Sequence, residues 1–139
     1  MFETKSIGLE EALKAKEAIF AEFAAGTDNP GALCITDASG AEVLCARVDG
    51  APARMLGRAR AKAYTAARVG MNTVDFRDHV VKANRRTLDD WGDPKLTTLQ
   101  GGLAIRSGGQ VVGGIAMSGN STIRDEALAR IGLEAMGVE

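Results

Sequence analysis

Apolar positions at both ends of the chain recur with the spacing of amphipathic helices. Between residues 7 and 25 they return every three or four residues while glutamates and lysines fill the other positions, which predicts a helix that ends at Gly26. The same spacing recurs over residues 122–136, where Asp125 follows Thr122 by three residues as in a capping box. Both segments predict surface helices with one buried face.

Two further helices are predicted in the middle of the chain. Pro52 suits a helix start, Gly70 suits a helix stop, and residues 53–69 between them place several alanines on one face. Such a face allows an unusually close approach to a sheet or to another helix. A weaker helical pattern covers residues 73–88.

Short apolar runs separated by turn signals predict two β-hairpins. Residues 32–37 and 42–48 flank the turn DASGA, and residues 102–106 and 111–117 flank SGGQ. Strands that are joined as hairpins and segregated from the helices are typical of an α+β fold with an antiparallel sheet.

The glycine-rich stretch over residues 98–120 does not match a phosphate-binding loop. A P-loop requires a lysine after its last glycine, none follows Gly113 and Gly114, and no GxGxxG occurs in the chain. These two glycines instead indicate a bulge or close packing by another element. Gly101 and Gly102 mark the entrance to a strand, where exposed backbone amides can hold an anion.

The two cysteines, Cys34 and Cys45, flank the first turn. A two-residue Ser39-Gly40 loop would place them directly opposite each other, whereas a turn opened by Asp37 with a left-handed Gly40 would shift the register by one residue. Cysteines of cytosolic proteins are most often small buried hydrophobic residues. Without a CxxC motif or a nearby histidine, the pair does not predict a metal site.

Length and composition narrow the class of protein. A chain of 139 residues, 45% hydrophobic and 25% charged, predicts one globular domain over residues 1–139. A net charge of −1 disfavours nucleic acid as a partner. No apolar run approaches the roughly 20 residues of a membrane span, and the acidic N-terminal segment does not resemble a signal peptide. We therefore expect a cytoplasmic protein with no membrane partner.

Positively charged residues cluster in the middle of the chain, although the net charge of the whole chain is close to zero. The stretch has Asp49 as its only acid and carries Arg47, Arg54, Arg58, Arg60, Lys62 and Arg68. These residues form either a solvated helix face or a site for a small anion such as a carboxylate. Lys62 is either solvated or partly buried with a lowered pKa. Tyr64 and Thr65 beside it are either packing and capping groups or hydrogen-bond donors to a ligand.

The single histidine, His79, lies in the weakest helical segment. A structural or capping role is the simplest interpretation, and the functional alternatives are a general base and a single axial ligand to an iron. One histidine cannot build a three-ligand zinc site, and the absence of a GxSxG elbow argues against a serine hydrolase.

Four segments occur in this order: ITDASGAEVLCARVDGAP, RARAKAYTAARVG, LQGGLAIRSGGQVVGGIAMSGN and RDEALARIGLEAM. Together they resemble the GlcG/HbpS family, which includes the C-terminal haem-binding domain of PduO-type proteins, and the similarity runs from about Leu9 to Gly137. The resemblance implies a profilin-like sandwich, with a central antiparallel sheet of about five strands and helices on its faces. It also implies homo-oligomers and the binding of haem or a related tetrapyrrole.

Two hypotheses of function follow from the resemblance and the basic stretch. In the first, the protein binds haem or another planar anionic ligand, with the carboxylates met by Arg54, Arg58 or Lys62 and the iron met by His79. The other candidate contacts to this ligand are Arg47, Tyr64, Thr65, Gly101 and Gly102.

In the second hypothesis, the protein is an enzyme of small-molecule catabolism that acts on a compact carboxylate or an aromatic acid. Lys62 would be the base or the anion anchor, and Asp49 or His79 would be its proton-transfer partner. Arg47 would stabilise the developing charge.

Overall fold

Two β-hairpins join along their inner strands to form one antiparallel sheet in the computed structural model, which describes residues 1–138. The strands are β1 (Ala32–Asp37), β2 (Glu42–Arg47), β3 (Gly102–Ser107) and β4 (Gln110–Ser118). Their order is β2-β1-β4-β3, so β1 and β4 are central. The expected number of about five strands was wrong: within the described residues the sheet has four, because the segment that links the hairpins forms helices and loops.

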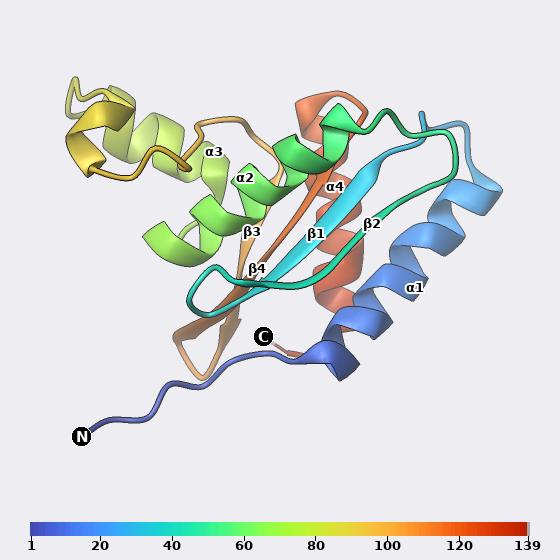
Figure 1. The fold of residues 1–139 in the computed structure, drawn as a ribbon, viewed down its shortest axis with the longest axis horizontal. Helices are drawn as coiled ribbons and strands as arrows, with labels where there is room; N and C mark the ends of the chain where they lie inside the picture. Colours follow the sequence, from blue (N-terminus) through green and yellow to red (C-terminus); the bar gives the residue numbers. More distant parts are fainter. Residues whose placement is uncertain (139) are drawn as a thin grey trace.

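Helices cover both faces of this sheet (Figure 1). α1 (Leu9–Ala25) and α4 (Thr122–Ala135) pack side by side on one face, and α2 (Arg54–Val69) lies on the other. α1 and α4 were predicted from their apolar spacing and α2 from Pro52, Gly70 and its alanine face, and the α+β architecture with an antiparallel sheet is confirmed. No helix in the described part of the chain combines the length and the apolarity that a bilayer crossing requires.

Each face of the sheet has its own core. Leu33 and Ile35 of β1 belong to the larger cluster, which α1 and α4 complete. Successive side chains of a strand point to opposite faces, so Cys34 belongs to the cluster under α2. That cluster consists mainly of small residues: Ala32, Cys34, Met55, Ala59, Ala63 and Ala116. The predicted alanine face of α2 is therefore confirmed as the face that meets the sheet.

Glycines of β3 and β4 allow α2 to lie directly on the sheet. A Cβ atom at Gly102 would lie 2.5 Å from the carbonyl oxygen of Lys62, and one at Gly114 would overlap the carbonyl oxygen of Ala63. Both obstacles are helix backbone, which cannot rotate away as a side chain can. The prediction of close packing at Gly114 is confirmed.

The segment between α2 and β3 differs from the single helix predicted over residues 73–88. It forms α3 (Thr73–Asp75), the π-helix η1 (Phe76–Lys82) and the 3-10 helix η2 (Leu88–Trp91). The buried residues of η1 are Phe76 and Val81, whose separation matches the i→i+5 hydrogen bond of a π-helix. The wider turn lets both side chains enter one small cluster with Leu96.

The first turn decides the register of the two cysteines. Asp37 opens the turn and Gly40 has a left-handed φ of 89°, which is the geometry that was expected to misalign them. An irregularity in the β1–β2 register just before the turn absorbs the extra residue, and Cys34 pairs directly opposite Cys45.

Candidate functional site

Two cavities lie along α2. The first, the hairpin cavity, measures about 780 Å³ and lies between the β1–β2 hairpin, α2 and residues 94–96. The second, the lysine pocket, measures about 230 Å³ and lies between α2, residues 118–120 and the start of α4. The basic stretch divides between them by helical spacing. Arg60 and Arg68 line the hairpin cavity, whereas Arg58 and Lys62 line the lysine pocket.

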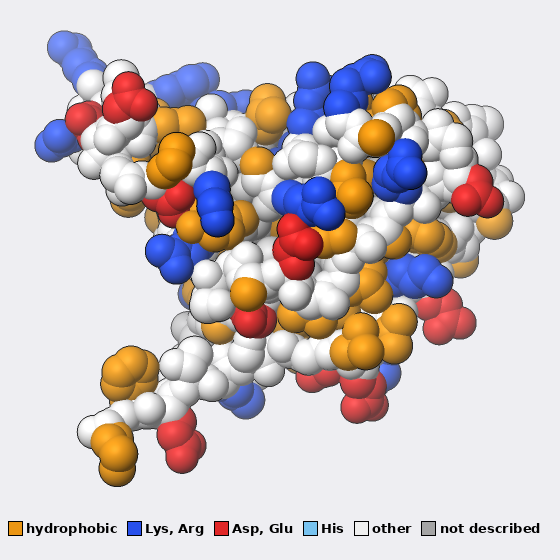
Figure 2. Space-filling view, in the orientation of Figure 1, with side chains coloured by type: hydrophobic (Ala, Val, Ile, Leu, Met, Phe, Trp, Pro, Cys, Tyr) orange, Lys and Arg blue, Asp and Glu red, His pale blue; other side chains and the backbone are white. Residues whose placement is uncertain are grey.

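Cationic side chains surround an aromatic ring in the hairpin cavity. Arg68 and Lys95 lie over the ring of Tyr64, at 5.6 and 5.5 Å from its centroid. The hydroxyl of Tyr64 donates a 2.7 Å hydrogen bond to Asp93, which raises the pKa of Tyr64 and keeps it a neutral phenol. Arg60 lies on the same helix face and pairs with Glu42, which also lines the cavity, at 2.7 Å. The cavity therefore has three cations, one of them paired with a carboxylate, and one flat aromatic ring. Figure 2 shows basic side chains spread over this side of the molecule, with apolar groups between them.

The hairpin cavity also contains an unsatisfied hydroxyl. Thr36 lines the cavity and is only 1% exposed, and its Oγ1 has no hydrogen-bond partner among the described residues. A buried hydroxyl without a partner costs about 1–3 kcal/mol. Thr36 lines the cavity although its Oγ1 is itself buried, so a ligand polar group that displaces the side chains around it can satisfy this hydroxyl.

The lysine pocket is built around a buried ion pair. Lys62 and Asp125 are each 2% exposed, and the Lys62 Nζ lies 3.2 Å from the Asp125 Oδ2. The ammonium also donates to the carbonyl of Met117 at 3.0 Å, and the Asp125 Oδ1 accepts from the amide of Asn120 at 2.9 Å. Burial lowers the pKa of Lys62 and raises the pKa of Asp125, and the attraction between the two charges opposes both shifts. The pair therefore joins α2 to the start of α4.

The size of the lysine pocket restricts what can enter it. Sites for cofactors and drug-sized ligands measure about 300–1,000 Å³, and this pocket, at about 230 Å³, falls below that range. Arg58 and Lys62 give it positive charge, but Lys62 already has two partners. A compact anion fits this pocket, whereas a porphyrin does not.

The other predicted site residues lie elsewhere. Arg47, Arg54 and Asp49 are exposed and line none of the described cavities. The guanidinium of Arg47 donates to the carbonyl of Ala51 at 3.1 Å. His79 is also outside these cavities, and its exposed ring lies 4.0 Å from a carboxylate oxygen of Asp75.

Thr65 and the two glycines have structural partners. The buried hydroxyl of Thr65 donates to the carbonyl of Ala61 and accepts from the amide of Thr97. The amide of Gly102 donates to Thr73, so it is already engaged within the protein. Gly101 lies against the Lys62 side chain, where a Cβ atom would come within 2.8 Å of the Nζ.

Sequence reasoning missed several groups that the fold brings together. Arg60, Tyr64 and Arg68 are spaced by four residues and therefore share one helix face, a signal that was present in the sequence but was not used. Thr36 and Lys95 had no such signal, because they come from a strand and a loop that meet α2 only in the folded chain.

The comparisons with known proteins agree with this architecture. The model of the HbpS-like haem degrading protein family matches residues 7–134. No curated protein sequence matches the chain. A double mutant of HbpS from Streptomyces reticuli superposes with a TM-score of 0.83 at 29% identity, covering 96% of this chain and 89% of that one.

Two other solved structures share the fold. PduOC in complex with heme has a TM-score of 0.81 at 25% identity, over 96% of this chain and 97% of that chain. ORFY of Klebsiella pneumoniae has a TM-score of 0.85 at 21% identity, over 99% and 94% respectively. Because the family model matches nearly the whole sequence, the chain belongs to the HbpS-like haem degrading protein family.

Proposed function

We propose that this protein binds haem, or a related planar anionic tetrapyrrole, in the hairpin cavity. The observation that carries the proposal is a cavity of about 780 Å³ that combines three cations with an aromatic ring. Its volume lies within the range of about 300–1,000 Å³ that is typical of cofactor sites. Family membership and the heme complex of PduOC support the same class of ligand.

The side chains of this cavity match the two chemical features of such a ligand, its carboxylates and its flat apolar face. Arg68 and Lys95 would hold its carboxylates through charge-assisted hydrogen bonds, while Arg60, paired with Glu42, adds positive charge to the cavity wall. The ring of Tyr64 and the side chain of Leu96 would contact its flat apolar face. Bound haem would supply an iron centre whose reactivity depends on its axial ligand.

The iron ligand is a separate hypothesis. His79 is the histidine that the sequence offers, and its ring is exposed and lies outside the described cavities. Replacing His79 by alanine tests this role: loss of the bound-haem Soret band would support it. A spectrum identical to that of the unmodified protein would remove His79 from the site and leave the binding proposal intact.

Haemin titration of the apo protein tests the proposal itself. We expect a shifted Soret band that saturates at one haemin per chain, and a double variant, Arg68→Gln with Lys95→Gln, that binds at least about tenfold more weakly. The matched control, Lys14→Gln with Arg130→Gln, removes the same charge from exposed positions of α1 and α4. Equal affinities for the two double variants would contradict the site, and a spectrum equal to that of free haemin would contradict the function.

A Thr36→Val substitution should separate ligand binding from folding. Removing the unpaired hydroxyl is expected to leave the apo protein equally stable, or more stable by up to about 1 kcal/mol. If the hydroxyl serves the ligand, the same change weakens haemin binding about fivefold to tenfold. Thermal unfolding of the apo protein and haemin titration measure the two effects. A less stable protein with unchanged haemin affinity would show that Thr36 serves the fold.

Binding is preferred here over the enzyme hypothesis. The lysine pocket has the size for a compact carboxylate, but the proposed proton-transfer partners Asp49 and His79 do not line it. No comparison supports an enzyme that acts on such a substrate. A homo-oligomer, a cytoplasmic location and a profilin-like topology stay predictions of the sequence.

A further inference from the structure

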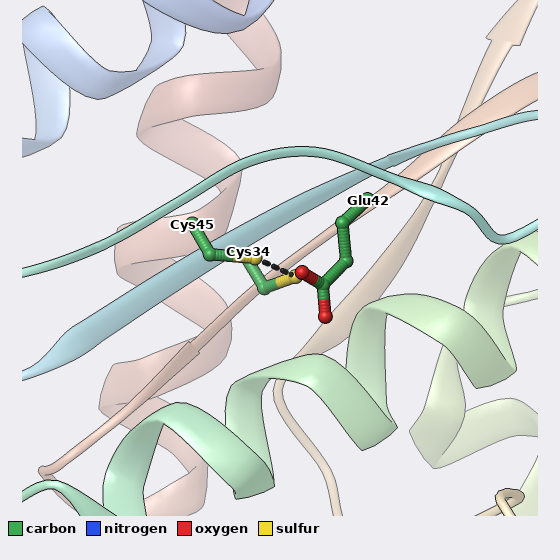
Figure 3. A group of neighbouring side chains, drawn as sticks. All are labelled: Cys34, Glu42 and Cys45. Atoms are coloured by element: carbon green, nitrogen blue, oxygen red, sulfur yellow. Dashed lines mark hydrogen bonds between the residues drawn. The ribbon is translucent and has the colours of Figure 1, made fainter.

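The two thiols of the first hairpin lie beside each other (Figure 3). Cys34 of β1 and Cys45 of β2 occupy directly opposite positions, and their sulfur atoms are 2.7 Å apart. Side chains at opposite positions of an antiparallel pair point to the same face of the sheet. Both thiols therefore lie on the side of the sheet that faces α2. Cys34 is two residues before Thr36, which points to the same face of β1 and lines the hairpin cavity.

The backbone separation of such a pair suits a disulfide. Cα atoms of directly opposite antiparallel residues are about 4.5 or 5.5 Å apart, depending on the hydrogen-bonding pattern. Disulfides span Cα separations of about 4.4–6.8 Å. In either pattern, Cys34 and Cys45 can be joined without moving β1 away from β2.

The surroundings make the two thiols unequal. The Cys34 side chain is fully buried, and the hydrogen bond that it shares with the Cys45 sulfur, together with this burial, raises the pKa of Cys34. Cys45 is only partly buried, and this hydrogen bond, together with the nearby Arg60 guanidinium, lowers the pKa of Cys45. Cys45 is thus the more accessible and the more nucleophilic of the two sulfurs.

Cys34 and Cys45, together with Glu42, also form a group of potential metal ligands. The ligand atoms of Cys34, Glu42 and Cys45 all lie within 4.8 Å of one another, which sequence reasoning did not foresee because no histidine or CxxC was present. However, the Arg60 Nε lies 2.7 Å from the Glu42 carboxylate and adds positive charge to the cluster. A guanidinium at this position opposes a divalent cation and favours a thiolate.

We propose that Cys34 and Cys45 are a site of reversible oxidation, at which a hydroperoxide converts the two thiols into one disulfide. The Cys45 thiolate attacks one peroxide oxygen and the O–O bond breaks. Hydroxide is the leaving group, and Cys45 becomes a sulfenic acid. The Cys34 sulfur then attacks the sulfenic sulfur, the S–O bond breaks, and the departing hydroxide takes the Cys34 proton. With hydrogen peroxide as the oxidant, two thiols lose two electrons and two water molecules form.

This site does not depend on haem binding. It does adjoin the proposed ligand cavity, because Glu42 and Arg60 line that cavity and also contact the thiol cluster. Oxidation to the disulfide removes the thiolate charge that the Arg60 guanidinium stabilises, so the oxidation state of the pair changes the electrostatics of the cavity wall.

Peroxide treatment of the apo protein tests the proposal. Intact mass spectrometry should record a loss of about 2 Da, for the two hydrogens removed, that a dithiol reductant reverses. In Cys34→Ala, the sulfenic acid on Cys45 should persist and be trapped by dimedone. In Cys45→Ala, the remaining buried thiol should react at least about tenfold more slowly. Arg60→Met should slow oxidation of the otherwise unchanged protein.

Two outcomes would overturn the proposal. One is a peroxide-treated protein of unchanged mass whose thiols are both alkylated after denaturation, since the pair would then be inert. The other is retention of one Zn²⁺ per chain through gel filtration with protection of both thiols from peroxide, which would assign the cluster to a metal. The unmodified chain serves for both measurements, so neither depends on how well a variant folds.

Discussion

Asp125→Asn is expected to lower the free energy of unfolding by about 3–5 kcal/mol. The substitution keeps the size of the side chain but removes the charge that faces Lys62, whose Nζ is 3.2 Å from the carboxylate. Lys62 then stays fully buried without a counter-charge, and only neutral carbonyl oxygens, of Met117 and of the introduced amide, can accept from its ammonium. The Lys62 ammonium must either stay charged without a counter-ion or lose its proton, and each of these lowers the free energy of unfolding.

Urea unfolding of three variants measures this effect. The control Glu10→Gln disrupts the exposed Glu10–Lys14 pair, in which the lysine Nζ lies 3.9 Å from the carboxylate Oε1. It should change the free energy of unfolding by less than about 0.5 kcal/mol. The double variant Lys62→Met with Asp125→Leu should regain much of the loss, because it leaves no unpaired buried charge. A loss below about 1 kcal/mol for Asp125→Asn would mean that water reaches Lys62 and that the pair is not a buried one.

Gly114→Ala is expected to cost about 3 kcal/mol, at the upper end of the range for overpacked cores. The added methyl group would overlap the carbonyl oxygen of Ala63 and would lie 3.1 Å from the amide nitrogen of Ala67. Both atoms belong to the backbone of α2, so the whole helix must move away from β4. Haemin affinity should fall with stability, because α2 carries the cationic face of the hairpin cavity.

Gly57→Ala is the matched control on the same helix. Gly57 is exposed, no atom lies within 4 Å of its added Cβ, and an alanine inside a helix is favoured over glycine by about 0.5–1 kcal/mol. Its melting temperature should therefore rise while that of Gly114→Ala falls. Similar shifts for the two variants would contradict the role of Gly114 as the contact between helix and sheet.

Much of the fold was predictable because its signals are local. Apolar spacing located α1 and α4, Pro52 and Gly70 with an alanine face located α2, and turn residues located both hairpins. Small residues indicated that α2 would lie close to another element, and Gly114 with Ala63 is where this occurs. The failures have equally physical reasons. The burial of Phe76 and Val81, five residues apart, favours a π-helix that a search for spacings of three and four does not find.

The candidate site was less predictable. The basic stretch was treated as one group, although Arg58 with Lys62 and Arg60 with Arg68 face different cavities. Asp125 was noted only as a helix cap, yet it is the counter-charge of Lys62 from a segment 63 residues away. The two candidate turns were weighed for Cys34 and Cys45, but the strand irregularity that restores their pairing lies in contacts between strands.

The positions of α1, α2 and α4, the two antiparallel hairpins and the family were contained in the order of residues, because they depend on neighbours within a few positions and on a recognisable series of motifs. The hairpin cavity, the buried Lys62–Asp125 pair and the facing thiols emerged only when the chain folded. Each of them joins segments that are distant in sequence. Their distances and burial are set by how α2 packs on the sheet, which no local pattern encodes.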